Sequence, residues 1–565
     1  MKLILTSLFT FIIGFALAQS TIKNKKQIAD VIYVNGKFVT LDAKNTIGQA
    51  VAIKDGKILQ VGSIEQIKAL ANVNTKTIDL HGKTVLPGFI DGHAHPSLAM
   101  LMKQFHDGRG NTTPSVAVLL DKIKSAAATT PAGEWIVFMG SSSSQTRFTE
   151  RRLPTRAEFD AAAPNNPVWF LNGSHETVVN SAALSKLGIA KGVAAPTGVH
   201  VDYDANGEPT GVLQEPMSIF PFIKVPDADL RRYFVDDTPK MWNAQGYTSI
   251  LAIVPAWEFT TISDLANNHT PLKLRYTFVA VADPAGQFIP HNFKTLAFPS
   301  TVDANWYRFG GIKVWVDSDI PIKGGAVSEP YPGGGNGVLN FTQGQLNEIA
   351  LRAHKMGVPM FAHATGDRAT AMTLTAFEWV KQQDTSSPHT LQRIEHFGEF
   401  IIGPNDLARA KRLGVYGNIT PIWVYTLGQS MVENLGPERA RGSYRFRDMI
   451  DAGIQPGAGT DLTGVYFDSL NPFDNIWAAV TRNSDIGSKF TPEQAVTVDE
   501  ALRMWTIWAA RAQEEDAIKG SLEAGKLADM IVISGNILTI PAEQIRNLKV
   551  LKTIVGGQEV YSSKK

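Results

Sequence analysis

Hydrophobic and polar positions near the two ends of this chain follow a short, strand-like pattern. From Asp30 to Pro87, apolar runs such as DVIYVNGKFVTLD are broken by Asn-Gly, Asp-Gly and His-Gly pairs. Asn-Gly and Asp-Gly between such runs are strong signals for β-hairpins. The same texture returns in KLADMIVISGNI and VLKTIVGGQEVY near the C-terminus. Because the ends of a domain often lie close together, the pattern predicts one β-sandwich built from residues 19–87 and 515–565.

The long middle of the chain, residues 88–514, alternates between strand-like and helical patterns. Its strand-like runs include PVWFLNG, LKLRYTFVAVA, FGGIKVWVD, GVPMFAHA and GIQPGAGTD. Helical patterns such as TQGQLNEIALRAHKMG and PNDLARAKRLG lie between some of them, the second with a capping pair at Asn405-Asp406 and a stop at Gly414. This alternation predicts an α/β fold, most economically a (β/α)₈ barrel of the TIM type with insertions. A doubly wound sheet is the alternative.

The first residues, MKLILTSLFTFIIGFALAQS, have the pattern of a secretory signal peptide. Lys2 gives a positive start, an apolar stretch follows, and Ala16-Leu17-Ala18 matches a cleavage site of small residues. An uncleaved anchor helix is the alternative, although the apolar run is short for a membrane span. The pattern predicts a signal peptide at residues 1–18 and a soluble mature protein that is exported, either periplasmic or secreted.

Length, charge and cysteine content narrow the class of protein. A chain of 565 residues is too long for one simple core. The net charge of +1, without a basic block, argues against a nucleic-acid or membrane partner and favours a small-molecule substrate. The sequence has no cysteine, so thiolate ligands are excluded and any metal must be held by histidine, carboxylate or a modified lysine. A homodimer is left open.

Two histidines in the stretch GFIDGHAHP, residues 88–96, are the first candidates for chemistry. His93 and His95 are two residues apart, so on a strand both side chains lie on one face. They follow an apolar run and fall at the C-terminal end of the predicted strand, where barrel enzymes build their sites. Taken alone, the pair fits a metal site and a solvated turn equally well.

Three later residues favour the metal site. His363, His396 and Asp461 each close a strand-like run, and a glycine or a turn follows each of them. A single histidine in such a place is usually a hydrogen-bonded core residue. Four histidines and a carboxylate that converge on one barrel mouth would instead suit Zn²⁺ or a similar divalent ion.

Several motifs resemble those of the amidohydrolase superfamily. They are PGFIDGHAHP near the start, HATGDRA at 363–369, RIEHFGEF at 393–400, GAGTDL at 457–462 and GSLEAGKLADMIVI at 520–533. NGSHETVVNSAAL at 172–184 and GEPTGVLQE at 207–215 are similar to the branch of N-substituted formamide deformylase. The resemblance covers nearly the whole mature chain and implies a barrel with a composite β-sandwich.

The resemblance also implies roles for the candidate residues. His93 and His95 would bind one metal, and His363 and His396 would bind a second metal or complete a shared site. Asp461 would touch the metal and move the proton.

Many members of the superfamily bridge two metals with a carboxylated lysine, and Lys313 in FGGIKVWVDSD occupies the matching place. Carboxylation needs a neutral amine, which burial favours. Two alternatives are a Lys313–Asp317 ion pair and Glu215 as the bridging ligand. The chain departs from the family at Asp317-Ser318, where Asp-Gly is common.

Substrate contacts are predicted around the same mouth. In the branch, the loop that holds His175 faces the substrate, and His175 would polarise the scissile carbonyl; a hydrogen-bonded loop histidine is the alternative. Glu215 is a second candidate for substrate contact. Trp423 and Tyr425, in PIWVY, are the preferred pocket aromatics, ahead of Trp315, Tyr331 and Tyr466.

The predicted reaction is hydrolysis of a carbon–nitrogen bond other than a peptide bond. An N-substituted formamide or another N-acyl amine is the preferred substrate, and one or two divalent ions, taken as Zn²⁺, are the predicted cofactor. A cyclic amide, a carbamate or an ester is the alternative substrate. A catalytically silent binding protein is the alternative class, and the complete set of ligand-type residues argues against it.

Overall fold

The computed structural model describes residues 27–222, 224–281, 298–384, 392–463 and 467–563. The predicted signal peptide and Tyr466 lie outside the described residues. Within the described ranges, no helix is long and apolar enough to cross a membrane.

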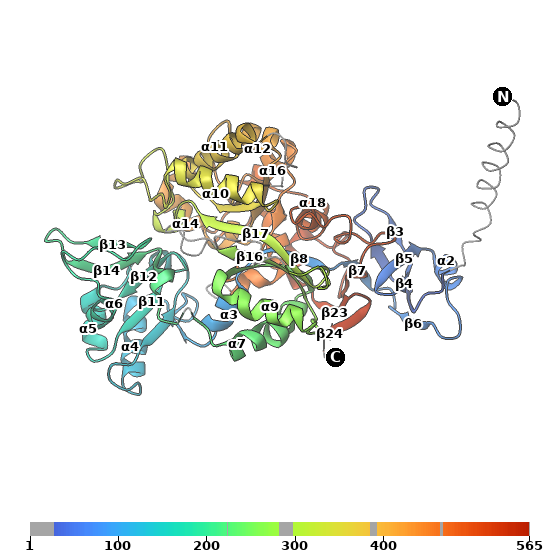
Figure 1. The fold of residues 1–565 in the computed structure, drawn as a ribbon, viewed down its shortest axis with the longest axis horizontal. Coiled ribbons are helices and arrows are strands. Elements are labelled where there is room, and N and C mark those ends of the chain that lie inside the picture. Colours follow the sequence, from blue (N-terminus) through green and yellow to red (C-terminus); the bar gives the residue numbers. More distant parts are fainter. Residues whose placement is uncertain (1–26, 223, 282–297, 385–391, 464–466, 564–565) are drawn as a thin grey trace, which may run out of the picture.

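Eight parallel strands form the centre of the molecule (Figure 1). In order they are β8 (Phe89–Ala94), β15 (Tyr247–Pro255), β16 (Arg275–Val281), β17 (Tyr307–Trp315), β18 (Met360–His363), β19 (Arg393–Glu395), β20 (Tyr416–Ile419) and β21 (Gly457–Ala458). Each strand pairs with the next along the chain, and Ala94 of β8 forms a parallel bridge with Leu462 just after β21. The sheet is therefore a nearly closed α/β barrel, as the alternating pattern predicted, and not a doubly wound sheet.

Helices with one apolar face cover the outside of this barrel. The longer ones are α9 (Phe259–Asn267), α10 (Gln343–Lys355), α11 (Asp367–Gln383), α12 (Asp406–Leu413) and α17 (Pro472–Thr481). Gly414 ends α12 with a φ of 71°, the left-handed conformation that glycine adopts without strain. Helix α14 (Gly428–Leu435) is as long as α12, and shorter helices are α3 (Pro96–Met102), α7 (Asp227–Arg232), α8 (Thr238–Asn243), α13 (Trp423–Thr426), α15 (Pro437–Ala440), α16 (Phe446–Asp451), α18 (Val498–Met504) and α19 (Ile507–Arg511). Helix α2 (Ile64–Lys68) packs on strands of the N-terminal region instead.

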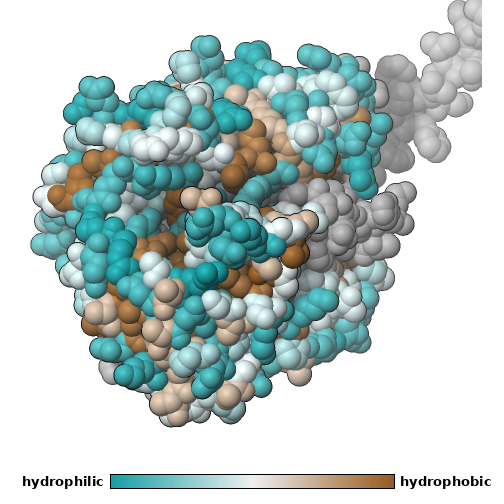
Figure 2. Space-filling view, turned by 90° about the vertical axis from the view of Figure 1, so that its left-hand side faces the viewer, coloured by the Kyte–Doolittle hydropathy of each residue, from teal (hydrophilic) through white to brown (hydrophobic). Residues whose placement is uncertain are grey.

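A second sheet is inserted between the first two barrel strands and forms the lobe on the left of Figure 1. Its strands are β9 (His106–Asp107), β10 (Ile136–Met139), β11 (Val168–Leu171), β12 (Glu176–Val179), β13 (His200–Tyr203) and β14 (Pro209–Gln214). They are accompanied by α4 (Val116–Ala127), α5 (Arg156–Ala162) and α6 (Ser181–Leu187). Seen from this side, hydrophobic residues lie in recesses between hydrophilic ones (Figure 2).

The inserted sheet corrects one sequence prediction. The run PVWFLNG was expected to be a barrel strand, but its residues form β11 of the inserted sheet. All four residues of β11 are buried, as they are in barrel strands such as β18. A fully apolar run therefore shows that a strand is buried, but not which sheet it joins.

The two ends of the chain meet in a six-stranded sheet. It combines β2 (Lys37–Val39), β3 (Ile47–Gly48) and β7 (Thr84–Pro87) with β22 (Met530–Ile533), β23 (Val550–Val555) and β24 (Gln558–Ser562). A four-stranded sheet of β1 (Val31–Val34), β4 (Ala50–Lys54), β5 (Lys57–Gly62) and β6 (Lys76–Asp79) shares a hydrophobic cluster with it. Tyr33 and Val51 from the smaller sheet join Val85 and Met530 from the larger one in that cluster.

Candidate active site

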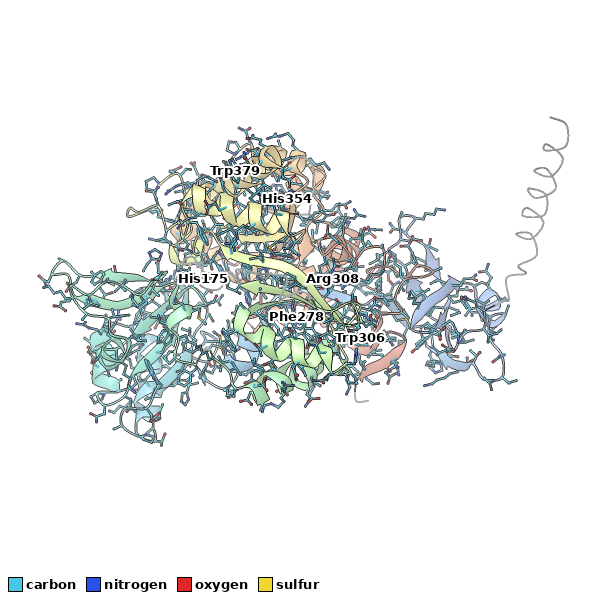
Figure 3. The ribbon with its side chains drawn as sticks, in the orientation of Figure 1. His175, Phe278, Trp306, Arg308, His354 and Trp379 are labelled. Carbon is cyan, nitrogen blue, oxygen red and sulfur yellow. The ribbon has the colours of Figure 1, made fainter. Side chains whose placement is uncertain are left out.

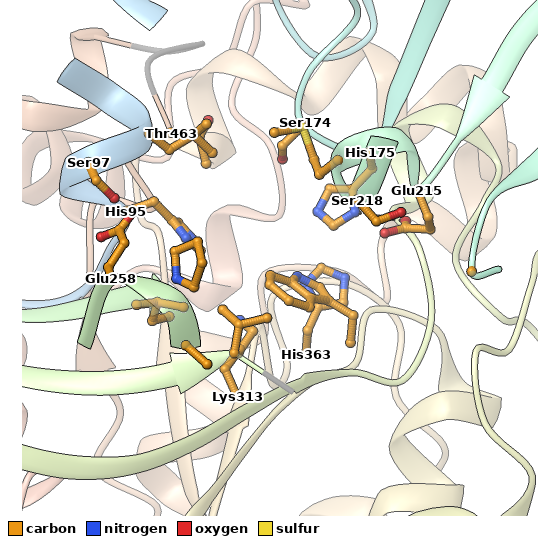
Figure 4. Close-up of a pocket in the computed structure, with 18 of the residues that line it drawn as sticks. His95, Ser97, Ser174, His175, Glu215, Ser218, Glu258, Lys313, His363 and Thr463 are labelled. Carbon is orange, nitrogen blue, oxygen red and sulfur yellow. Dashed lines mark hydrogen bonds and ion pairs between the residues drawn. The ribbon is translucent and has the colours of Figure 1, made fainter. Parts of the chain in front are cut away.

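The C-terminal ends of the barrel strands bring the predicted ligand residues together. His93 lies in β8, Lys313 in β17 and His363 at the end of β18. His396 follows β19 directly, and Asp461 lies three residues after β21. These residues and His95 line one cavity of about 240 Å³ (Figure 4).

One group of donor atoms has the spacing of a metal site. Nε2 of His93 lies 3.3 Å from Nε2 of His95, and these two nitrogens lie 3.3 and 3.2 Å from Oδ1 of Asp461. Nζ of Lys313 lies 3.4 Å from Nε2 of His93. Ligands that surround Zn²⁺ tetrahedrally at 2.0–2.1 Å are about 3.3 Å apart, so these atoms fit the edges of such a site.

Two buried carboxylates fix which histidine nitrogen faces the cavity. Oε2 of Glu395 lies 2.5 Å from Nδ1 of His93, and Oε2 of Glu399 lies 2.9 Å from Nδ1 of His396. An ionised carboxylate can only accept, so each Nδ1 carries the proton and each Nε2 is left as a free lone pair. The structure therefore presents both imidazoles in the tautomer that binds a metal.

His396 and His363 form a second group of candidate ligands near Asp461. Oδ2 of Asp461 is 3.7 Å from Nε2 of His396, whose ring centroid is 4.8 Å from that of His363. Nε2 of His363 donates to the carbonyl of Ser318 across 3.3 Å, which leaves its Nδ1 as the nitrogen that could bind a metal. Ligand atoms of His93, His396 and Asp461 all lie within 4.8 Å of one another. The residues present thus fit one ion, or two ions on either side of Asp461.

The backbone at this site is strained. His396, Asp461 and Glu215 have φ angles of 68°, 44° and 53°, in the left-handed region that residues with a Cβ rarely adopt. Such conformations persist where the surrounding structure enforces them, and they cluster at functional sites.

Lys313 is completely buried, and burial lowers the pKa of its amine to about 8. The alternative partner, Asp317, is also buried, but its carboxylate accepts hydrogen bonds from the backbone N–H groups of Ala326, Thr365 and Gly366. Lys313 therefore faces His93 rather than Asp317, and its amine is easier to deprotonate than that of an exposed lysine.

The inserted sheet contributes His175 and Glu215 to the cavity. His175 lies in the turn between β11 and β12, where the inserted sheet meets the barrel (Figure 3), and its ring centroid is 4.9 Å from that of His363. Nδ1 of His175 lies 2.9 Å from Oε1 of Glu215. Burial lowers the pKa of His175, but the charge and hydrogen bond of Glu215 and the charges of Asp319 and Asp461 together outweigh this and raise the pKa to about 9. His175 is therefore a cationic donor at neutral pH, and Glu215 is its partner.

Comparison with known proteins agrees with this geometry. The sequence pattern of the amidohydrolase family matches residues 76–561. The chain belongs to the amidohydrolase family. It is 30% identical to N-substituted formamide deformylase of Arthrobacter pascens, over 94% of this chain and 98% of that protein. It is 26% identical to protein LONG AFTER FAR-RED 3 of Arabidopsis thaliana, over 94% and 92% of the two chains.

A solved structure shares the fold of this amidohydrolase. It is an uncharacterized metal-dependent hydrolase from Pyrococcus horikoshii, with a TM-score of 0.70 and 22% identity over 91% of this chain and 99% of that one.

The predicted pocket aromatics of the amidohydrolase lie in different places. Trp315 lines the cavity, whereas Trp423 and Tyr425 are not among the described residues that do so. Trp423 stacks on His396, with ring centroids 5.3 Å apart and planes at 17°, and therefore packs against a candidate ligand. Tyr425 packs edge-on against Trp477. The hydroxyl of Tyr331 donates to the carbonyl of Gly325.

Sequence reasoning missed several residues of this site. Glu395 and Glu399 lie next to His396 in RIEHFGE, so their position beside a candidate ligand was a usable signal. Ser97 and Glu258 also line the cavity. Glu258 is a single glutamate in VPAWEF, with no spacing or motif that marks it in the sequence.

Proposed function

We propose that this chain is an exported, metal-dependent amidohydrolase that cleaves the carbon–nitrogen bond of a non-peptide amide, an N-substituted formamide or another N-acyl amine. The observation that carries the proposal is the position of Asp461. Its carboxylate lies within 3.7 Å of the Nε2 atoms of His93, His95 and His396. A carboxylate in this place both completes a ligand set and faces a water held there.

In this proposal, His93, His95 and Asp461 would hold one Zn²⁺, and His363 and His396 would hold a second. Lys313, carboxylated on its amine, would be a further ligand. When bound, the ions supply Lewis acidity and lower the pKa of a water molecule towards neutrality.

The chain's own residues then guide the protons and the developing charge. Burial acts to raise the pKa of Asp461, but its interactions with His93, His95 and His396 hold it well below its usual range. Asp461 is therefore ionised, accepts the proton of the attacking water and passes it to the leaving nitrogen. His175, kept protonated by Glu215, donates a hydrogen bond to the carbonyl oxygen as negative charge develops there.

The apolar wall of the cavity supports a substrate with a hydrophobic substituent. Leu98 and Leu101 of α3, together with Ile253, Val281 and Trp315 at the strand ends, form much of this wall. The name of the Arthrobacter relative, N-substituted formamide deformylase, is the reason for placing the formamide first. The export part of the proposal rests on the N-terminal sequence pattern alone.

A screen of matched substrates tests the reaction class. The mature protein, loaded with zinc, is incubated with the N-butyl formamide, the N-butyl acetamide, a lactam of similar size, a butyl carbamate and butyl formate. We expect release of butylamine from the two open-chain amides at the highest kcat/KM. Faster cleavage of the lactam, carbamate or ester would overturn the substrate class, and a zinc-loaded protein inactive on all five would favour a silent binding protein.

A further inference from the structure

One buried acid in the cavity is not used by the proposed reaction. Glu258 ends a short 3₁₀ turn, Ala256–Glu258, just after strand β15, and only 1% of its surface is exposed. Its Oε2 has no hydrogen-bond partner among the described residues. Ser97 of α3, also buried, is the side chain that hydrogen-bonds to this carboxyl group. Figure 4 shows the two residues side by side next to His95.

The surroundings of Glu258 do not compensate for its burial. The same cavity is lined by apolar side chains of α3, β15 and β16, namely Leu98, Leu101, Ile253 and Val281. Burial raises the pKa of Glu258 to about 8, and the hydrogen bond from Ser97 only partly opposes it. A buried polar oxygen without a partner is costly, so a ligand that supplies a donor would recover free energy here.

Two polar pairs lie on opposite sides of the cavity. His175 and Glu215 lie on one side in Figure 4, Ser97 and Glu258 lie on the other, and Lys313 lies between them. A substrate whose carbonyl is held beside His175 would extend its substituent along the apolar wall. The end of that substituent would then meet Glu258.

We propose that Glu258 and Ser97 form a subsite for a protonated amine at the far end of the substrate's substituent, so that the substrate is a mono-acylated diamine or a similar ω-amino amide. This inference rests on the proposed function and specifies its substrate class.

A cation fits this subsite better than a neutral group for two reasons. An ammonium favours the ionised form of Glu258, and hydrogen bonds between an ammonium and a carboxylate are about twice as strong as those between neutral partners. Trp257 and Trp315 line the same cavity, and indole rings attract cations through their faces.

The first test compares two formamides that differ only at the far end of the chain, N-(4-aminobutyl)formamide and N-pentylformamide. We expect the zinc-loaded enzyme to prefer the amine by about tenfold in kcat/KM, the worth of one charged hydrogen bond. Glu258→Gln keeps the shape but cannot ionise to pair with an ammonium. It should abolish the preference and leave hydrolysis of N-pentylformamide within about threefold of wild type.

Asp264→Asn is the matched control, because it removes one negative charge from helix α9, a few residues along the chain, where Asp264 is exposed and pairs with Arg231. It should keep the preference. Hydrolysis of both formamides with equal efficiency by wild type, or a preference that survives in Glu258→Gln, would overturn the inference and leave the proposed function intact.

A binding measurement separates the two proposals if no amide is cleaved. Calorimetry with butylammonium and with 1-butanol is carried out on the zinc-loaded protein. Glu258→Gln should weaken butylammonium binding about tenfold and leave 1-butanol unchanged, and Ser97→Ala should weaken butylammonium by a smaller factor. Equal effects on the two ligands, or none, would overturn the subsite. Thermal melting of each variant checks that the fold is retained.

Discussion

The carboxylate of Glu395 lies 2.5 Å from Nδ1 of His93, and both side chains are completely buried. Arg393 also contacts this carboxylate, with its Nε 2.8 Å from Oε1. Burial alone would raise the pKa of Glu395, but the charge of Arg393 and the hydrogen bond with His93 lower it well below its ordinary value. Glu395 therefore stays ionised and directs Nε2 of His93 towards Asp461. In this way, a buried ion pair inside the barrel orients a candidate metal ligand.

The equivalent contact, between Glu399 and His396, predicts that a change at Glu399 weakens metal binding. Replacing Glu399 by glutamine removes the charged acceptor of the His396 Nδ1 proton, so divalent metal should bind about 10- to 100-fold more weakly. Competition with a chelator measures this. Glu378→Gln is the control, because Glu378 pairs with Arg409 on the outside of the barrel. Unchanged affinity in Glu399→Gln would show that His396 is not a ligand.

The buried Arg393–Glu395 ion pair predicts that loss of one partner lowers the stability of the folded protein. Glu395→Gln leaves the guanidinium of Arg393 buried without its counter-charge, which should lower the free energy of unfolding by about 3–5 kcal/mol. Urea denaturation measures the change. Glu158→Gln breaks the surface pair with Arg152 and should cost no more than about 1 kcal/mol. Similar losses in the two variants would contradict the importance of burial.

The proposed role of Asp461 as proton acceptor predicts that its replacement abolishes most of the catalysis. Asp461→Asn keeps the size of the side chain but cannot accept a proton at neutral pH, so kcat should fall by at least about 100-fold. Steady-state kinetics at saturating zinc, with metal content determined in parallel, provides the measurement. A variant that retains full turnover would remove Asp461 from the proton pathway.

Carboxylation of Lys313 predicts that the activity of the zinc-reconstituted enzyme depends on bicarbonate. The neutral amine would add to carbon dioxide, forming an N–C bond and releasing one proton, and the low pKa of Lys313 favours this step. Zinc reconstitution in ¹³C-bicarbonate should give a carbamate carbon signal by NMR and higher activity than reconstitution in bicarbonate-free buffer. Lys313→Arg should show neither effect. A wild-type protein that is fully active without bicarbonate and gives no such signal would disprove carboxylation.

The burial of Glu258 predicts that the difference in stability between wild type and Glu258→Gln changes with pH. Its pKa is about 8 in the folded chain because of burial, against an ordinary value near 4.5, so the unfolded chain binds fewer protons between these two pH values. The stability that the protonated acid provides is complete below about pH 4.5 and is lost as the pH rises towards 8. Wild type should therefore lose stability relative to Glu258→Gln by up to about 1.4 kcal/mol per pH unit in that window.

Urea denaturation of both proteins at pH 5, 6.5 and 8 tests this, because the other titrating groups cancel in the difference. A difference that stays constant with pH would mean that Glu258 is solvated in the folded protein.

The local pattern of apolar and polar residues was sufficient to predict the barrel strands that end in candidate ligands. The runs that end at His363, His396 and Asp461 combine an apolar stretch with one ligand-type residue and a turn, and this pattern is a property of consecutive residues. It failed for the run at Val168–Leu171, because a buried strand has the same composition in either sheet. Trp423 illustrates a second limit. Its position near the barrel mouth was predictable, but the direction of its ring, against His396, was not.

By itself the sequence determined the α/β class, the family motifs and the histidines and aspartate that form the candidate metal site, because hydrophobic periodicity and ligand type are both local. Only the tertiary structure decided that residues 106–214 form a separate sheet and bring His175 and Glu215 over the barrel. It also decided that Glu258 is buried beside Ser97, and that Glu395 and Glu399 orient the ligands. These relationships depend on burial and on distances between residues far apart in the chain. Neither burial nor such distances can be predicted from a short stretch of sequence.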